Sequence, residues 1–229
     1  LPQIGFFFAD QRDDVLRKYV AAVFENGLAI KPKIWADWWA GPIYCSYADQ
    51  VYHHIITSGI RKDESGATVY CNEAFLAERL QIMDDHRIPY GIITLDYGWL
   101  DRLGDYNPNI DHFADLRDYI DRMHEAGKHV LLWFAPFFCE SESELAKAHP
   151  DWMIKNRDGS INEHIWMKKR IFTPDFTNPA VRDHYAAMIH RLLSPAASAL
   201  NADGFKIDGY SFLPGVDQVY HDPAWGTGD

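Results

Sequence analysis

The stretch NADGFKIDGYSF, residues 201–212, holds two charged side chains at a spacing suited to chemistry. Lys206 and Asp208 are two residues apart, so on a β-strand both point to the same face. Phe205 and Ile207 then point to the opposite face. Charged side chains are seldom buried unless they have a partner or a function. The pattern therefore predicts a strand that lines a wet cavity or ends at one.

The residue types at this strand allow three interpretations. A carboxylate such as Asp208 can serve as a nucleophile, and the adjacent Lys206 would favour its ionised form. A lysine can instead form a Schiff base, but it then needs its pKa lowered by desolvation or by another cation. Asp208 would do the opposite, so an aldolase is the weaker hypothesis. An internal salt bridge that holds the floor of the fold is the structural alternative.

Other candidate residues lie where apolar runs end. Asp96 follows the run GIITL and is itself followed by Tyr-Gly-Trp99, and Trp133 lies within KHVLLWFAPFF. Asp37 lies in the aromatic stretch KPKIWADWW, whose tryptophans are mostly expected to be packing residues. Asp175 precedes a predicted helix and is expected to order a loop. The segment RKDESG is expected to be a solvated loop at the rim of the site.

Strands and helices alternate along the sequence. Apolar runs predict strands over residues 4–9, 31–39, 89–99, 128–138 and 202–208, and helical spacing predicts helices over 10–27, 72–88, 112–127, 141–150 and 178–194. This order is typical of βα units with a parallel sheet, in which polar residues gather at the carboxyl ends of the strands. A (β/α)8 barrel of the TIM type is the predicted fold. A doubly wound sheet is the alternative, although no glycine-rich nucleotide-binding motif follows any strand.

The domain organisation is predicted from where this alternating pattern begins. Residues 1–30 form a strand and helix that precede the barrel and are compatible with the end of an upstream β-sandwich. Residues 31–229 supply the amino-terminal portion of the barrel, about four βα units. A full barrel needs about 250 residues, so we expect the sequence to be part of a longer enzyme.

Composition narrows the class of ligand. The net charge is −11, which argues against nucleic-acid binding because that function requires a basic surface. Aromatic residues make up 14% of the chain, and aromatic faces with carboxylates suit neutral polyhydroxylated ligands. Three scattered cysteines and the absence of H-x-x-x-H pairs predict neither a metal site nor a cofactor. No signal peptide or membrane segment is recognised, so a cytoplasmic location is expected, and homo-oligomer formation stays open.

Four motifs resemble one group of enzymes. LDYGW, LLWFAPF, DFTNPAVRDHY and DGFKIDGY occur in the order and at the spacing found in retaining α-glycosidase barrels of glycoside hydrolase families 31 and 36. DFTNP and GFKIDG favour family 31, whereas LDYGW and HPDW favour family 36. The resemblance extends over residues 35–212.

The resemblance implies roles for individual residues. Asp208 would be the nucleophile, Lys206 would hydrogen-bond the sugar, and Asp96 would bind its distal hydroxyl groups. Trp133 would form a wall of the same subsite, with Asp37 and Trp99 as further candidates for substrate binding. The implied activity is hydrolysis of terminal α-galactosides or α-glucosides through a covalent intermediate.

The second catalytic carboxyl group is not recognised in the sequence. In these families the general acid/base comes from a later strand, so it is expected beyond residue 229. A carbohydrate-binding barrel without catalytic activity is therefore the main rival to the enzyme hypothesis.

Overall fold

The structure is a computed structural model, and it describes residues 7–29, 35–61, 64–209, 214–215, 217–222 and 224. Two compact units are present, Leu1–Ala40 and Gly41–Asp229. The division falls after residue 40 instead of residue 30, since the first strand begins only at Ile43. Among the described residues, no helix has both the length and the apolar character needed to cross a membrane.

In the described residues of the first unit there are one α-helix and one turn of 3-10 helix. Helix α1 (Arg12–Glu25) confirms the prediction for residues 10–27. Residues 7–9 of the strand predicted over 4–9 have no regular structure, and the rest of that prediction lies outside the described residues.

The strand predicted over residues 31–39 is wrong in its described part. Asp37–Ala40 forms the 3-10 helix η1. Residues four apart in a strand would be about 13 Å apart, whereas the rings of Trp35 and Trp39 have centroids 5.4 Å apart. Packing between these neighbouring tryptophans therefore accompanies a helical turn in place of the extended chain.

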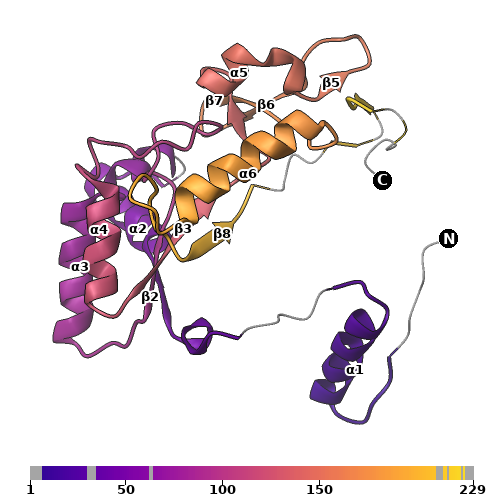
Figure 1. Cartoon of the computed structure of the whole chain (residues 1–229). Helices are drawn as coiled ribbons and strands as arrows, with labels where there is room; N and C mark the ends of the chain where they lie inside the picture. The colour runs from indigo at the N-terminus through magenta and orange to yellow at the C-terminus, as the bar shows by residue number, and fades with distance from the viewer. Residues whose placement is uncertain are drawn as a thin grey trace. The chain divides into compact units, whose positions relative to one another are not determined.

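Four parallel strands form the main sheet of the second unit (Figure 1). In spatial order they are β1 (Ile43–Cys45), β2 (Ile92–Leu95), β3 (His129–Phe134) and β8 (Gly204–Ile207). The predicted strands in 89–99, 128–138 and 202–208 are confirmed. Because neighbouring strands are parallel throughout, their carboxyl ends lie along one edge of the sheet.

The helices that connect these strands begin at the side chains that the sequence suggests. Helices α3 (Glu73–Asp85), α4 (Leu116–Glu125) and α6 (Pro179–Leu193) confirm three predictions. The Asn72 and Asn178 side chains each accept a hydrogen bond from a backbone amide of the first turn, at 2.9 Å. These helices complete the βα units that carry β2, β3 and β8.

Helix α2 (Ser46–Ser58) was not predicted. Its sequence, SYADQVYHHIITS, is rich in β-branched and aromatic residues with low helix propensity. The helix ends at Gly59, which has a φ of 73° in the left-handed region that glycine favours. Helix α2 follows directly from the end of β1, and the 3-10 helix η2 (Glu64–Tyr70) is the next element along the chain.

A small antiparallel subdomain lies between β3 and α6. It contains β4 (Cys139–Glu140), α5 (Glu144–Ala148), the 3-10 helix η3 (Pro150–Trp152), β5 (Lys155–Asn156), β6 (Glu163–Trp166) and β7 (Lys169–Phe172), and β5 pairs with β9 (Gln218–Val219). Strands β6 and β7 form a hairpin through Met167 and Lys168, both at positive φ, as a two-residue type I′ turn requires. Only α5 of this subdomain was predicted.

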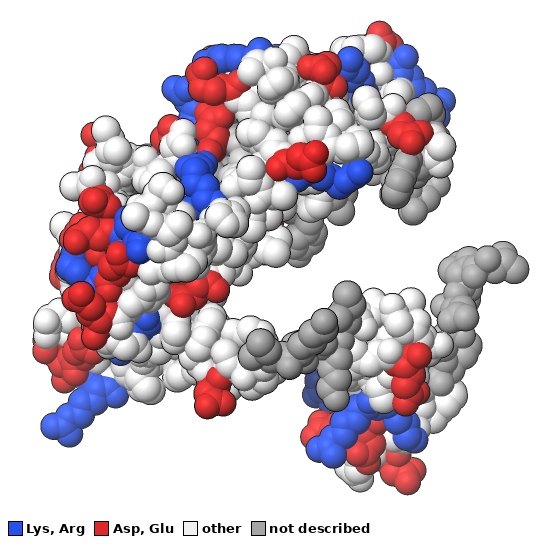
Figure 2. Space-filling view, viewed as in Figure 1, with Lys and Arg blue, Asp and Glu red and all other residues white. Residues whose placement is uncertain are grey.

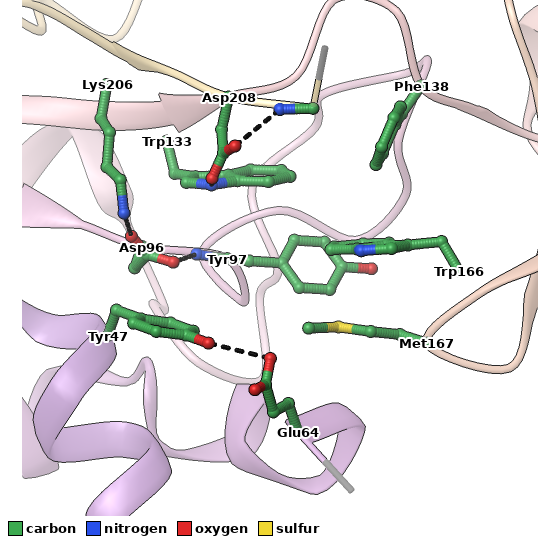
Figure 3. A pocket seen from close by; sticks show the side chains of 11 residues that line it. Tyr47, Glu64, Asp96, Tyr97, Trp133, Phe138, Trp166, Met167, Lys206 and Asp208 are labelled. Carbon is green, nitrogen blue, oxygen red and sulfur yellow. Dashed lines mark hydrogen bonds and ion pairs between the residues drawn. The ribbon is translucent and has the colours of Figure 1, made fainter. Parts of the chain in front are cut away.

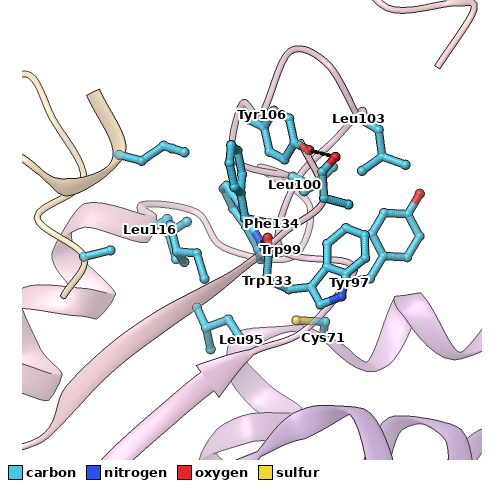
Figure 4. Close-up of a cluster of buried hydrophobic side chains, with 14 of the residues drawn as sticks. Cys71, Leu95, Tyr97, Trp99, Leu100, Leu103, Tyr106, Leu116, Trp133 and Phe134 are labelled. Atoms are coloured by element: carbon cyan, nitrogen blue, oxygen red, sulfur yellow. Dashed lines mark hydrogen bonds between the residues drawn. The ribbon is translucent and has the colours of Figure 1, made fainter. Parts of the chain in front are cut away.

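The hydrophobic core holds the carboxyl end of β3 in place (Figure 4). Trp99 and Tyr106 are fully buried, and their polar atoms are nevertheless paired. Trp99 Nε1 donates to the Trp133 carbonyl oxygen at 2.9 Å, and Tyr106 OH donates to the Ala135 carbonyl oxygen at 2.6 Å. These bonds fix the backbone on which the side chain of Trp133 is mounted.

Candidate active site

A pocket of about 250 Å³ opens at the carboxyl edge of the sheet (Figure 3). Its lining comes from the ends of β3 and β8, from the residues after β2, and from α2, η2 and the β6–β7 hairpin. The lining residues are Tyr47, Glu64, Asp96, Tyr97, Trp133, Phe138, Trp166, Met167, Lys206, Asp208 and Gly209. Four of the six residues predicted from the sequence, Asp96, Trp133, Lys206 and Asp208, therefore lie together.

Asp96 is anchored from several directions. Its side chain is 3% exposed, Oδ1 accepts from the Tyr97 amide at 2.9 Å, and Oδ2 accepts from the thiol of Cys45 at 3.4 Å. Its own backbone amide donates to Ser46 Oγ at 3.0 Å, and its carbonyl accepts from the Cys71 thiol. The carboxylate is therefore held in one orientation by residues of β1, α2 and the segment before α3.

Lys206 is the ionic partner of Asp96. Its Nζ lies 2.6 Å from Asp96 Oδ2. Burial of Lys206 lowers the pKa of the amine, but the hydrogen bond and charge of Asp96 outweigh burial, so that the pKa is raised. The sequence led us to expect that Lys206 favours the ionised form of Asp208. The ammonium group donates its short hydrogen bond to Asp96, and its interaction with Asp208 is through charge alone.

Asp208 has its own neutral donors. Trp133 Nε1 donates to Oδ2 at 3.1 Å, and the Gly209 amide donates to Oδ1 at 2.7 Å. Gly209 has a φ of 75°, and a Cβ atom there would lie 2.7 Å from the Cβ of Ala135. Glycine is thus required for the close approach that brings this amide to the carboxylate. Two donors on different elements fix the plane of the Asp208 carboxylate.

Aromatic rings form one wall of the pocket. Trp133 and Trp166 are nearly parallel, with an interplanar angle of 8° and centroids 5.9 Å apart, and Tyr97 packs against both. The predicted site residue Trp99 is not part of this wall. Its side chain is fully buried in the core, because its indole NH is needed to hold the carbonyl of Trp133.

The opposite side of the pocket contains a tyrosine and a glutamate. Tyr47 OH donates to Glu64 Oε2 at 2.8 Å, and the Lys206 ammonium lies 5.4 Å from the centre of the Tyr47 ring. Burial and the neighbouring Glu64 raise the pKa of Tyr47 to about 12, so the phenol keeps its proton at neutral pH. Glu64 belongs to the loop 61–66 that was expected at the rim of the site.

Asp37 is in the first unit, at the start of η1. Its assignment to a barrel strand is wrong, for the reason given above. Its predicted contact with substrate stays a prediction.

Several lining residues were not predicted from the sequence. Tyr47 belongs to PIYCSY, a short apolar run that has the length of a buried strand. Trp166 and Met167 reach the pocket through the antiparallel hairpin, and no local sequence signal indicates where that hairpin lies. Within the described residues, no group of three or more His, Cys, Asp or Glu side chains is arranged to hold a metal ion.

Comparison with known protein families identifies this arrangement. The profile described as the glycosyl hydrolases family 31 TIM-barrel domain matches residues 57–224, which is most of the chain. The chain belongs to glycosyl hydrolases family 31. Membership confirms the predicted barrel class, and the sheet of this family 31 domain contains four barrel strands within the described residues.

One relative of this family 31 domain is a fungal enzyme. An α-xylosidase of Emericella nidulans is 28% identical over 142 residues, which is 60% of this chain and 17% of that protein. The chain thus spans about a sixth of that relative's length.

Solved structures of related enzymes show the same fold. An α-galactosidase from Thermus thermophilus in complex with stachyose has a TM-score of 0.55 and 24% identity, over 76% of this chain and 33% of that one. A family 31 dextranase from Flavobacterium johnsoniae in complex with glucose has a TM-score of 0.63 and 18% identity. The match covers 93% of this chain and 24% of the dextranase.

Proposed function

We propose that this family 31 domain carries the nucleophile and sugar-binding wall of a retaining exo-acting α-glycosidase. The observation that carries the proposal is the convergence of Asp208 with the Asp96–Lys206 pair in a pocket walled by indole rings. The substrates proposed are terminal α-galactosides or α-glucosides, since related proteins include an α-galactosidase with bound stachyose and a dextranase with bound glucose. No cofactor takes part in the proposed reaction.

Each side chain has a distinct part in the proposed reaction. An oxygen of Asp208 forms a bond to the anomeric carbon while the bond from that carbon to the leaving oxygen breaks, which gives a glycosyl-aspartate. Water then attacks the anomeric carbon and releases the sugar and the free carboxylate. Asp96 and Lys206 present an acceptor and a donor to hydroxyl groups, and Trp133 offers an apolar face to the ring.

The proton for the leaving oxygen needs a second carboxyl group. Asp96 is poorly suited to supply it, because this carboxylate is tied to an ammonium group at 2.6 Å. We therefore propose, as the resemblance implies, that the acid/base comes from a later strand of the barrel. The aldolase alternative is disfavoured by the raised pKa of Lys206, since a Schiff-base lysine must lose its proton.

The proposal is tested by trapping the covalent intermediate. The full chain is incubated with 5-fluoro-α-galactosyl fluoride and with 5-fluoro-α-glucosyl fluoride, and intact mass is followed by peptide mapping. Fluoride departs without help from an acid, so the experiment reports on the nucleophile alone. We expect one adduct per chain, located on Asp208, and the preferred reagent indicates the sugar.

Two variants define the outcome of this experiment. Asp208→Asn is expected to abolish labelling, whereas Asp111→Asn, an exposed aspartate outside the pocket, is expected to label normally. If the full chain binds sugars but forms no adduct at high reagent and long times, the chain is better described as a carbohydrate-binding barrel. An adduct on another residue would show that Asp208 is not the nucleophile.

A further inference from the structure

The pair formed by Tyr47 and Glu64 has no part in the proposed nucleophilic attack. Both residues line the pocket, and Figure 3 shows them across it from Asp208. They come from α2 and η2, the two elements that follow β1. Tyr47 keeps its proton at neutral pH, and its hydroxyl group donates a hydrogen bond to Glu64, so the carboxylate is held at the wall by a neutral group.

The charges of the pocket do not balance within the described residues. The lining contains the three carboxylates of Glu64, Asp96 and Asp208 and the single ammonium group of Lys206, which gives −3 + 1 = −2. Lys206 is bound to Asp96 at 2.6 Å, whereas the hydrogen-bond donors to Asp208 and Glu64 are uncharged. A ligand that enters this pocket therefore meets a negative field.

We propose that Glu64 is a specificity-determining residue that favours sugars bearing a protonated amino group. This inference rests on the proposed function, because it assumes that a sugar occupies the pocket. An ammonium group gains from a nearby carboxylate, a neutral hydroxyl group gains less, and the carboxylate of a uronic acid is repelled. Among otherwise identical glycosides, the pocket is then expected to bind the cationic one most tightly, the neutral one less tightly and the anionic one most weakly.

The expected size of the preference follows from the exposure of Glu64. Glu64 is exposed to solvent, so water screens the interaction and an exposed ion pair contributes up to about 1 kcal/mol. That energy corresponds to about fivefold in the dissociation constant. The preference should shrink at high ionic strength, since salt screens exposed charges.

Binding to the full chain tests this inference without requiring turnover. Methyl α-galactoside and methyl α-glucoside are titrated by calorimetry, together with their 2-amino-2-deoxy, 6-amino-6-deoxy, N-acetylated and uronate derivatives. At pH 6 at least one amino derivative is expected to bind about fivefold more tightly than its parent, and the uronate more weakly. At pH 9 the 2-amino derivative has lost most of its proton, by comparison with a pKa of about 8 for an α-amino group, and its preference should disappear.

Matched variants assign the effect to Glu64. Glu64→Gln preserves an acceptor for Tyr47 and removes one of the uncompensated charges, so the preference for the amino derivative should fall clearly below that of the unmodified chain while the parent still binds. Glu78→Gln, on the exposed side of α3 and outside the pocket, should retain the full preference. Salt at 1 M should reduce the preference of the unmodified chain.

The outcomes separate this inference from the proposed function. If neutral and amino sugars bind equally at pH 6, or if Glu64→Gln keeps the preference, this inference is overturned and the proposed function stands. If none of the sugars binds to the pocket, the proposed function is overturned as well.

Discussion

Asp208 is oriented by two donors that lie on different parts of the chain. The indole of Trp133 comes from the end of β3, and the amide of Gly209 follows Asp208 itself. The arrangement fixes the direction in which a carboxylate oxygen faces the pocket. Orientation of this kind affects the rate of bond formation because small displacements of a reacting atom are costly.

Replacing Trp133 should slow formation of the glycosyl-aspartate. Trp133→Phe keeps an aromatic ring beside Trp166 but removes the donor to Asp208, so labelling by 5-fluoroglycosyl fluorides should slow about tenfold. Trp152→Phe, whose ring stacks on His149 away from the pocket, serves as the control. An unchanged labelling rate in Trp133→Phe would show that the indole NH does not orient the nucleophile.

Removing Lys206 should destabilise the fold as well as sugar binding. Lys206→Met leaves the buried Asp96 without its ionic partner, and losing one member of a buried pair costs about 3–5 kcal/mol. Because the Lys206 side chain is 36% exposed, we expect a smaller loss of about 2 kcal/mol in the free energy of unfolding. Urea denaturation of the variant and the unmodified chain measures the difference.

The pH dependence of this loss has a definite sign. The folded-state pKa of Lys206 is raised, so its contribution to stability is complete below the unfolded-state value of about 10.4 and is lost as pH rises through the folded-state value. The difference between Lys206→Met and the unmodified chain should therefore be constant from pH 7 to pH 9 and become smaller above it. A difference that vanishes at neutral pH would contradict the ion-pair assignment.

At the scale of elements, Asp203 connects the amino ends of β3 and β8. Its Oδ1 accepts from His129 Nδ1 at 2.8 Å, and its Oδ2 accepts from the Val130 amide at 2.7 Å and lies 2.8 Å from His124 Nε2 on α4. Burial raises the pKa of Asp203, but these hydrogen bonds outweigh burial and lower it. The carboxylate thus holds two strands and a helix at the end of the sheet away from the pocket.

Asp203→Asn should reduce stability in a pH-dependent manner. A lowered folded-state pKa contributes stability above the unfolded-state value, about 3.9, and this contribution is lost as pH falls through the folded-state value. At pH 7 we expect the free energy of unfolding of Asp203→Asn to be about 1–2 kcal/mol lower than that of the unmodified chain. This difference should become smaller as the pH falls below about 4. Thermal unfolding from pH 3 to pH 7 measures it, with the exposed Asp111→Asn as the control. If the difference in stability between Asp203→Asn and the unmodified chain stayed constant from pH 3 to pH 7, the lowered pKa of Asp203 would be contradicted.

At the scale of the whole molecule, the acidic charge is unevenly spread. Figure 2 shows acidic side chains gathered over helices α3 and α4, in a chain whose net charge is −11. Such a surface favours solubility and disfavours polyanionic partners. The predictions that the protein binds neither nucleic acid nor membranes agree with this charge and stay predictions.

The sheet presents two outer strands in the described part of the chain, β1 and β8. Ile43 and Ile207 on these strands are 58% and 68% exposed. Exposed apolar edge strands favour pairing with other chains. A TIM barrel closes its sheet, so these are the edges at which further strands of a family 31 barrel pair. In the given chain by itself, the same edges are expected to favour self-association.

Ile207→Lys should reduce that association. The side chain points to the face opposite Lys206, so a charge there disfavours pairing between edges without entering the pocket. Sedimentation velocity over a range of concentrations should show less dimer in this variant than in Ile110→Lys. Ile110 is 77% exposed in a loop, which makes it a control of equal charge. Equal association of the two variants would show that the β8 edge is not the contact.

Sequence patterns were sufficient where local chemistry alone determines structure. The helices α3, α4 and α6 follow from apolar residues at helical spacing, and the strands β2, β3 and β8 follow from buried apolar runs. Because parallel strands end at one edge, the sequence also predicted that Asp96, Lys206 and Asp208 meet, and the family resemblance added Trp133 to them. Helix α2 was missed because its stability comes from packing and not from the propensity of its residues.

Only the tertiary structure decided which groups pair within the site. Sequence spacing placed Lys206 beside Asp208, but the register of β8 and the position of Asp96 after β2 bring the lysine to Asp96 and leave Asp208 to Trp133 and Gly209. Tertiary structure also decides that Trp99 lies in the core and that Trp166, on the β6–β7 hairpin, lies in the pocket. Residue types and periodicity determine which elements form, whereas hydrogen-bond partners between distant segments depend on distances and directions that exist only once those elements pack.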